Sequence, residues 1–171
     1  ILENNEDFLI FVKRMMPRWI NGIPDSECLA LYRVLKESNL KNTSLIETGC
    51  GASTLALVLH AILNDCKIFS WDTNPSKGSF LKSVINEAVC KPLEVNLYDH
   101  WEFIAFDSTN SNLGIPVLKE LNVKPSLGFF DSLHTLEHLL KEINAFAECA
   151  EQTFYVVLDD ANYQNKTENY S

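Results

Sequence analysis

One acid, two glycines and a second acid are spaced along the chain as they would be in a cofactor site. Glu47 ends a short apolar stretch, Gly49 and Gly51 follow at once, and Asp72 comes directly after a second apolar stretch. Gly49 permits a tight turn from a strand into a helix, where a Cβ would be strained. Gly51 lets the backbone approach a ligand at a helix N-terminus, where N–H groups lack helical partners. Asp72 stands where an acid commonly accepts hydrogen bonds from a ribose.

A second group of acids lies further along the chain, together with a histidine. Asp131 and His134 are three residues apart, and Asp159 and Asp160 follow another apolar stretch. If the stretches before them are neighbouring strands, the three carboxylates converge. Mg²⁺ requires oxygen ligands of this kind, and a bound Mg²⁺ lowers the pKa of a substrate hydroxyl. His134 would then be placed to take the hydroxyl proton as a general base.

Apolar strand segments alternate with helical segments from residue 45 onward, and these elements must position the acids. The alternation predicts a mainly parallel sheet covered by helices on both faces, which is a doubly wound α/β fold. The expected strands are 45–48, 67–71, 101–106, 127–130 and 153–158, and the expected helices are 52–64, 77–90, 116–121 and 135–150.

Acids recur at or just after the ends of these strands. In open α/β sheets, ligands bind at the edge that the carboxyl ends of the strands form. Asp107 and Asp131 are also suited to cap the helices that follow them, but capping does not account for the whole set. The set comprises Glu47, Asp72, Asp107, Asp131, Asp159 and Asp160.

The first 44 residues predict a helical extension of two helices. The first has apolar residues at helical spacing and is interrupted by Pro17 and the turn at 21–24, and Asp25 or Ser26 is expected to cap the second. The extension either packs on the sheet or forms a lid over the substrate. The apolar residues of the first helix are Phe8, Phe11, Val12, Met15 and Trp19, and those of the second are Leu29, Leu31, Val34 and Leu35.

Composition narrows the class of protein. At 171 residues the chain is interpreted as a single domain, 1–171, with the extension at 1–44 and a cofactor-binding core at 45–160. The net charge of −9 argues against binding nucleic acid through its phosphates, and no apolar run is long enough to span a bilayer. Five scattered cysteines without a C-x-x-C pair are typical of reduced thiols, so we expect a cytoplasmic protein.

The first motif resembles a known cofactor site. A dinucleotide-binding turn reads G-x-G-x-x-G, whereas Thr54 stands in place of its third glycine. Glu47 would crowd a pyrophosphate but suits a cofactor that carries an ammonium group. Glu47-x-Gly49-x-Gly51, with Asp72 after the next strand, resembles motif I of class I methyltransferases that depend on S-adenosylmethionine (SAM). The resemblance implies SAM as cofactor, with Glu47, Gly49 and Gly51 around its methionine part and Asp72 on its ribose.

The second group of acids narrows the resemblance. Asp131-x-x-His134, with Asp159-Asp160 after the next strand, looks like the metal-dependent O-methyltransferases of the macrocin and cephalosporin-hydroxylase-like group. The resemblance implies that Asp131, Asp159 and Asp160 bind Mg²⁺ or another divalent cation. It makes His134 the catalytic base, with Asp131 beside it in the catalytic site. The residues that it places beside the adenine are Asp107 and Ser108.

The chain departs from this family in three respects. The family commonly has Gly at the position of Ser132 and an aromatic residue at that of Leu136. Eleven residues follow Asp160, whereas a complete class I methyltransferase continues with a helix and two strands. We therefore expect a sheet that lacks its last strands, as in a fragment or a pruned fold.

The expected activity is transfer of the SAM methyl group to a hydroxyl oxygen of a small molecule, with help from a divalent cation. No nucleic-acid or membrane partner is expected, and self-association is left open. One alternative is a SAM-binding protein, or an incomplete methyltransferase domain, that does not catalyse. A second is an NAD-dependent oxidoreductase, which Glu47 and Thr54 disfavour. A third is a zinc hydrolase, because His134-x-x-Glu137-His138 matches H-x-x-E-H, although His138 is expected to be an exposed helical residue.

Overall fold

Five parallel strands form one sheet in the computed structural model, which describes residues 4–159. Their order across the sheet is β3-β2-β1-β4-β5, and each strand is parallel to its neighbours. The predicted α/β fold with a mainly parallel, doubly wound sheet is confirmed. The strands are β1 (Ser44–Thr48), β2 (Lys67–Trp71), β3 (Trp101–Ile104), β4 (Pro125–Phe130) and β5 (Tyr155–Leu158).

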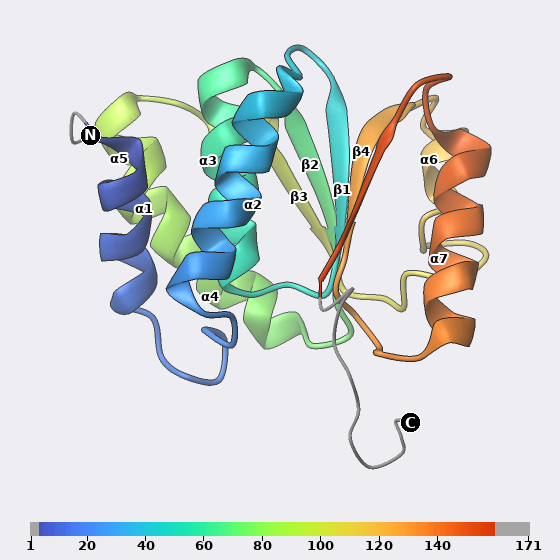
Figure 1. Ribbon diagram of the computed structural model, residues 1–171, viewed down its shortest axis with the longest axis horizontal. Helices are drawn as coiled ribbons and strands as arrows, with labels where there is room; N and C mark the ends of the chain where they lie inside the picture. The colour runs from blue at the N-terminus through green and yellow to red at the C-terminus, as the bar shows by residue number, and fades with distance from the viewer. Residues whose placement is uncertain (1–3, 160–171) are drawn as a thin grey trace.

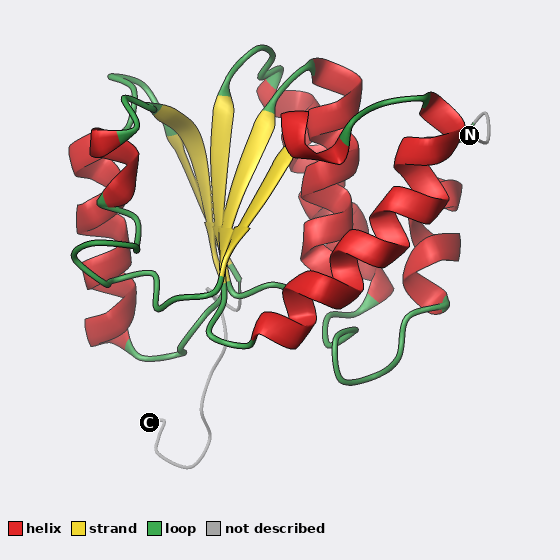
Figure 2. Cartoon of the chain, turned by 180° about the vertical axis from the view of Figure 1, so that it is seen from behind, coloured by secondary structure: helices red, strands yellow, loops and turns green. Residues whose placement is uncertain are grey.

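Helices cover the sheet on both faces, so the molecule has three layers (Figures 1 and 2). One layer contains α1 to α5 and the other contains α6 and α7 (Figure 1). The helices are α1 (Asn5–Arg14), α2 (Asp25–Ser38), α3 (Ala52–Asn64), α4 (Pro75–Ile85), a π-helical turn η1 (Asn86–Cys90), α5 (Lys91–Leu93), a 3-10 turn η2 (Leu97–Asp99), α6 (Val117–Glu120) and α7 (Leu136–Cys149).

A separate apolar core lies on each face of the sheet. Side chains alternate across a strand, so Leu45 of β1 belongs to the core beneath α1 to α4, and Ile46 belongs to the core beneath α6 and α7. Both are fully buried. Burial on both faces explains why the inner strands β1, β2 and β4 are largely apolar and lack a polar face, whereas the edge strands β3 and β5 are partly exposed.

The winding of the chain reverses at β1. The chain runs from β1 outward to β3 with helices on one face, and then crosses to β4 and β5 with helices on the other. The loops after β1 and β4 therefore leave the sheet in opposite directions, and the carboxyl edge at such a reversal is where ligands bind in open α/β sheets.

The predicted element boundaries hold within a few residues, with one clear difference in the second core helix. That helix begins at Pro75, because the Asn74 side chain accepts the backbone N–H of Ser76 and proline suits the first helical position. It ends as an α-helix at Ile85 and continues as the π-helical turn η1 to Cys90. β3 is two residues shorter than predicted, and β5 begins two residues later.

The predicted apolar stripe of the first helix is confirmed only in part. Val12 is buried and Phe8 packs against the same core, but Phe11 and Met15 are 58% and 63% exposed, and Leu9, which was not predicted, is buried. The capping prediction for α2 is wrong, because the helix starts at Asp25 without a side-chain cap. Asp25 instead binds the ammonium of Lys13, which is buried, and the guanidinium of Arg14. This ion pair fixes α1 against α2.

The structure also bears on the cysteines and on membrane-spanning segments. All five cysteines are buried and unpaired. Within residues 4–159, no helix combines the length and the apolar character that crossing a bilayer requires.

Candidate functional site

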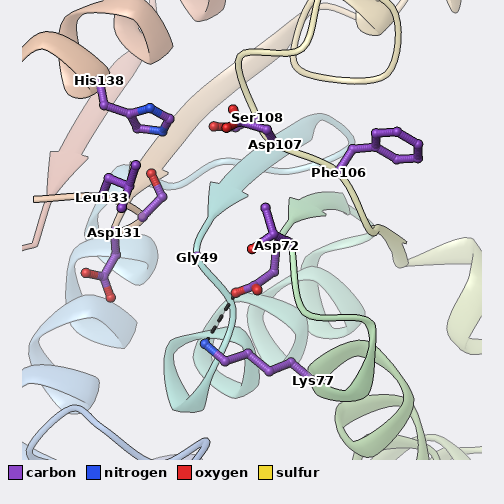
Figure 3. Close-up of a pocket in the computed structure, with 11 residues that line it drawn as sticks. Gly49, Asp72, Lys77, Phe106, Asp107, Ser108, Asp131, Leu133 and His138 are labelled. Atoms are coloured by element: carbon purple, nitrogen blue, oxygen red, sulfur yellow. Dashed lines mark hydrogen bonds and ion pairs between the residues drawn. The ribbon is translucent and has the colours of Figure 1, made fainter.

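A cavity of about 280 Å³ opens at the carboxyl edge of the sheet, over the point where the winding reverses. It is bordered by the loops that follow β1, β2, β3 and β4 and by α4 and α7 (Figure 3). We call it the first cavity. Its lining residues are Gly49, Asp72, Thr73, Lys77, Phe106, Asp107, Ser108, Asp131, Ser132, Leu133 and His138.

The turn after β1 requires glycine at position 49. Gly49 has φ +80°, and a Cβ there would lie 1.9 Å from the backbone carbonyl oxygen of Asp131. The turns after β1 and β4 thus touch through their backbones, which places Gly49 at the floor of the first cavity. Gly51 lies against the N-terminal segment, since a Cβ there would lie 2.9 Å from the carbonyl oxygen of Ile20. Its predicted role beside a cofactor stays a prediction.

Glu47 lies beneath the glycine turn and is fully buried. Its carboxyl group accepts hydrogen bonds from the hydroxyls of Ser53 (2.6 Å), Thr54 (2.7 Å) and Ser70 (2.9 Å). Thr54 in turn accepts the backbone N–H of Gly51. Burial raises the pKa of Glu47 to about 7, and the three hydroxyls oppose that shift. Glu47 therefore holds the turn and the start of α3 in place, and it does not line the first cavity.

Asp72 joins the turn after β2 to the glycine turn. Its Oδ2 accepts the backbone N–H of Cys50 (2.9 Å), and its Oδ1 accepts the backbone N–H of Asn74 (2.9 Å). The ammonium of Lys77 lies 3.4 Å from Oδ2, as the dashed line in Figure 3 shows. Asp72 lines the first cavity where the prediction placed it. Cys50 itself is buried, which raises the pKa of its thiol and makes it a poor nucleophile.

Asp107 and Ser108 form another wall of the first cavity. Thr109 donates its hydroxyl and its backbone N–H to Asp107, which lowers the pKa of that carboxyl below its ordinary value. Neither Asp107 nor Asp131 caps a helix, because α6 begins after Pro116 and α7 begins after Thr135.

A buried glutamate connects the walls of the first cavity. Glu142 of α7 is 1% exposed and accepts the hydroxyls of Ser108 (2.6 Å) and Ser132 (2.9 Å). The Nε2 of His138 lies 3.6 Å from the same carboxylate oxygen. The expectation that His138 is exposed is wrong, since its side chain is 13% exposed and faces the cavity (Figure 3).

A second cavity of about 360 Å³ lies on the other side of the glycine turn. The N-terminal segment contributes Trp19, Ile20, Gly22 and Ile23 to its wall, so the extension borders the site as well as packing on the sheet. Lys77 and Asp131 line both the first and the second cavity. The remaining lining residues are Gly49, Cys50, Gly51, Ala52, Ser53, Ser132, His134 and Asp159.

Asp131, His134 and Asp159 come together, as the neighbouring positions of β4 and β5 require. All three line the second cavity and also a third cavity of about 370 Å³ at the start of α7. The Nε2 of His134 lies 3.7 Å from Oδ1 of Asp131. Asp160, the third predicted metal ligand, lies outside the described residues. Among residues 4–159, no group of three or more potential ligating side chains is arranged to hold a metal ion.

The H-x-x-E-H match does not form a zinc site in the described part of the chain. His138 turns toward Glu142, whereas His134 lies near Asp131 and is 62% exposed. His138 therefore lines the first cavity, whereas His134 lines the third.

Comparison with known proteins identifies the fold. No protein-family model matches the sequence, and no curated protein matches it. A methyltransferase of Podospora anserina, PaMTH1, solved with S-adenosylhomocysteine (SAH), superimposes with a TM-score of 0.62 at 16% identity, over 93% of this chain and 62% of that one. This chain therefore spans less than two thirds of the length of that enzyme.

Two further solved structures are similar. A putative protein-L-isoaspartate O-methyltransferase of Plasmodium falciparum, in complex with SAH, has a TM-score of 0.54 at 14% identity, over 94% of this chain and 86% of that one. A putative RNA methyltransferase of Pyrococcus horikoshii has a TM-score of 0.57 at 10% identity, over 98% and 81%. The chain has the Rossmann-like fold of class I methyltransferases. At these identities the likeness establishes the fold alone.

The residues around the cavities that the sequence analysis did not assign to the site include Lys77, Phe106, His138 and Glu142. For Lys77 and Glu142, the sequence contains a feature that could have indicated their role. Lys77 is a cation in the first turn of a helix, where the macrodipole disfavours it. Glu142 falls four residues after His138 on the helix face that carries Leu139, Ile143 and Phe146 into the core.

Proposed function

We propose that this chain binds SAM at the carboxyl edge of its sheet and directs the methyl group to a hydroxyl oxygen of a small molecule. One observation carries the proposal: Gly49, Asp72 and Asp107 meet around one cavity at the reversal of the winding. In the same fold, two solved methyltransferases hold SAH.

The chemistry of the lining residues fits such a cofactor. Asp72 is an acceptor at the end of β2 and suits the ribose hydroxyls. Asp107, whose lowered pKa keeps it ionised at neutral pH, can accept an exocyclic amine. Gly49 lines the cavity, and the absence of its side chain lets the turn after β4 lie directly against the turn after β1. The bound cofactor would supply an electrophilic methyl group carried on a sulfonium.

The chain's own residues then act on the acceptor. His134 is the proposed base, because it lines the second and third cavities and lies near Asp131, whose carboxylate would stabilise the protonated ring. His134 would take the hydroxyl proton of the acceptor as the acceptor oxygen receives the methyl group and SAH is left as the other product. The segment 19–23 would help to exclude water from the second cavity.

Metal assistance stays a prediction. Asp131 and Asp159 line common cavities, and Asp160 follows directly in sequence. Calorimetric titration of Mg²⁺ into the wild type and into Asp159→Asn would measure the affinity of each protein for the metal. A magnesium affinity that the substitution removes would support the site, whereas no magnesium binding would remove the metal from the proposal.

The primary test is calorimetric titration with SAH, with NAD as the competing cofactor class. We expect micromolar SAH binding that Asp72→Ala weakens at least tenfold, since a charged hydrogen-bonding partner of the ribose is lost. Asp99→Ala, at an exposed acid away from the cavities, is the matched control and should bind normally. A folded wild type that binds NAD alone, or neither ligand, would overturn the proposal.

Acceptor identity needs a turnover assay with radiolabelled SAM. The similar structures do not agree on a class of acceptor, since one is named a putative protein-L-isoaspartate O-methyltransferase and another a putative RNA methyltransferase. A net charge of −9 disfavours a phosphate-rich acceptor, so hydroxylated small molecules come first. His134→Ala should abolish turnover and leave SAH binding unchanged. SAH binding without turnover on any acceptor would favour the non-catalytic SAM-binding alternative.

A further inference from the structure

Charge is distributed unequally around the three cavities. Acids dominate, and among the described residues that line these cavities Lys77 is the only lysine or arginine. The lining acids are Asp72, Asp107, Asp131, Glu142 and Asp159. A site of this kind attracts positive groups on a ligand and repels a negative one.

Lys77 stands where a lysine is otherwise unfavourable. It lies in the first turn of α4, close to the positive end of the helix dipole, and that turn carries no acid to offset it. Its Nζ is 3.4 Å from Oδ2 of Asp72, which is longer than the charged hydrogen bonds elsewhere in this chain, such as Lys13–Asp25 at 2.8 Å. The Lys77 side chain is 27% exposed and lines both the first and the second cavity.

The ligand of the proposed function carries three charges of different sign. Its sulfonium and ammonium groups are positive and suit the acids, whereas its α-carboxylate is negative and is repelled by them. The second cavity offers that carboxylate two favourable partners. One is the ammonium of Lys77, and the other is the N-terminus of α3, a helix of 13 residues whose first residues, Ala52 and Ser53, line the cavity.

We propose that Lys77 binds the α-carboxylate of the cofactor's methionine part and thereby selects ligands that carry an amino-acid tail. This inference rests on the proposed function and adds a specificity residue to it. The competing explanation is that Lys77 only neutralises Asp72. The two differ in one respect: neutralising Asp72 affects every ligand that has a ribose, whereas binding the carboxylate affects only ligands that have one.

The experiment compares three ligands by calorimetry. They are SAH, its decarboxylated analogue, and 5′-methylthioadenosine, which keeps the ribose and the thioether but lacks the whole amino-acid tail. The protein variants are the wild type, Lys77→Met and the control Lys82→Met, on the same helix, whose ammonium lies 5.7 Å from the Tyr98 ring centroid. Thermal unfolding of each variant confirms that it is folded.

We expect Lys77→Met to weaken SAH binding about tenfold or more, as the loss of a charged hydrogen bond implies, and to leave 5′-methylthioadenosine within about twofold of the wild type. The wild type alone should prefer SAH to the decarboxylated analogue, and this part of the test needs no variant. Lys82→Met should behave as the wild type.

Three results would overturn the inference. Equal losses for SAH and 5′-methylthioadenosine would show that Lys77 acts through Asp72 on the ribose. Unchanged SAH binding in Lys77→Met, or equal wild-type affinity for SAH and its decarboxylated analogue, would show that Lys77 does not bind the carboxylate. Failure of the wild type to bind any of the three ligands is a different outcome, because it removes the proposed function itself.

Discussion

Gly49 is the residue on which the candidate site depends most directly. Gly49→Ala places a Cβ 1.9 Å from the Asp131 carbonyl oxygen, a backbone atom, at a φ of +80°. We expect a loss of at least about 2 kcal/mol in the free energy of unfolding, together with loss of SAH binding. Denaturant unfolding monitored by circular dichroism measures the first and calorimetry the second.

Gly22→Ala is the matched control for this substitution. Gly22 lines the second cavity, but a Cβ there meets nothing within 4 Å. Its stability should stay within about 0.5 kcal/mol of the wild type. If Gly49→Ala and Gly22→Ala unfold at the same denaturant concentration, the backbone contact between the turns after β1 and β4 is not what requires glycine.

Glu47 makes the stability of the protein depend on pH. Burial raises its pKa from 4.5 in a model compound to about 7 in the folded chain, so the folded state holds its proton more tightly than the unfolded state does. The contribution is fully present below about pH 4.5 and is lost as the pH rises through about 7. The free energy of unfolding should fall by up to about 3 kcal/mol over this range from this group alone.

Glu47→Gln removes the titration and keeps the size of the side chain. The difference in unfolding free energy between the variant and the wild type, measured at pH 5 and pH 8, isolates Glu47 because all other groups are common to both. We expect the variant to gain relative to the wild type as the pH rises. Parallel pH profiles for the two proteins would contradict a raised pKa at Glu47.

The contacts of buried Glu47 could not be predicted from the spacing of residues in the sequence. The sequence places an acid two residues before Gly49, and the resemblance implies contact with the cofactor. Only the fold reveals that Ser53, Thr54 and Ser70 converge on it. A hint was present, since Ser70 interrupts an apolar strand, but its partner lies 23 residues away and spacing does not disclose it.

At the scale of elements, Glu142 of α7 ties together two loops that follow different strands. It accepts Ser108 from the loop after β3 and Ser132 from the loop after β4, and both loops line the first cavity. In Glu142→Ala both hydroxyls lose their acceptor, which should lower the free energy of unfolding by about 1–3 kcal/mol and weaken SAH binding. Denaturant titration and calorimetry give the two values.

Glu148→Ala on the same helix separates this role from a general effect of removing an acid. The Glu148 side chain is 67% exposed and pairs with Lys119 at the surface. Its loss should change stability by less than about 0.5 kcal/mol and leave SAH binding intact. Equal effects of the two substitutions would mean that Glu142 does not organise the loops.

The strands and core helices were predictable because burial on both faces leaves a plain signal. Apolar runs such as 67–71 end at acids or turn residues, and the alternation with helices then implies a parallel sheet. The stripe of α1 was not predictable in the same way. Phe8, Val12, Met15 and Trp19 share one helical spacing, but Leu9, Val12 and Met16 share another, and the position of α2 decides which set is buried.

At the scale of the whole molecule, the winding of the sheet gathers acids that are far apart in sequence at one edge. Asp72, Asp107, Asp131 and Asp159 follow four different strands and line connected parts of that edge. Topology alone accomplishes this, because all five strands are parallel and their carboxyl ends share an edge. This part of the candidate site was therefore predictable, whereas the contributions of α4 and α7 needed the packing.

The same gathering of charge leads to a prediction about ionic strength. SAM carries one more positive charge than SAH, and the edge that we propose to bind both is negative, in a chain of net charge −9. Salt screens exposed charges, with a Debye length that shrinks from about 30 Å at 0.01 M to about 3 Å at 1 M. Raising the salt over this range should therefore weaken SAM binding several-fold more than SAH binding. Calorimetric titrations of both ligands at each salt concentration test this, and Asp107→Asn should reduce the difference because it removes one of the attracting charges. If SAM and SAH respond equally to salt, the acids at the edge are not what favours the charged cofactor over its product.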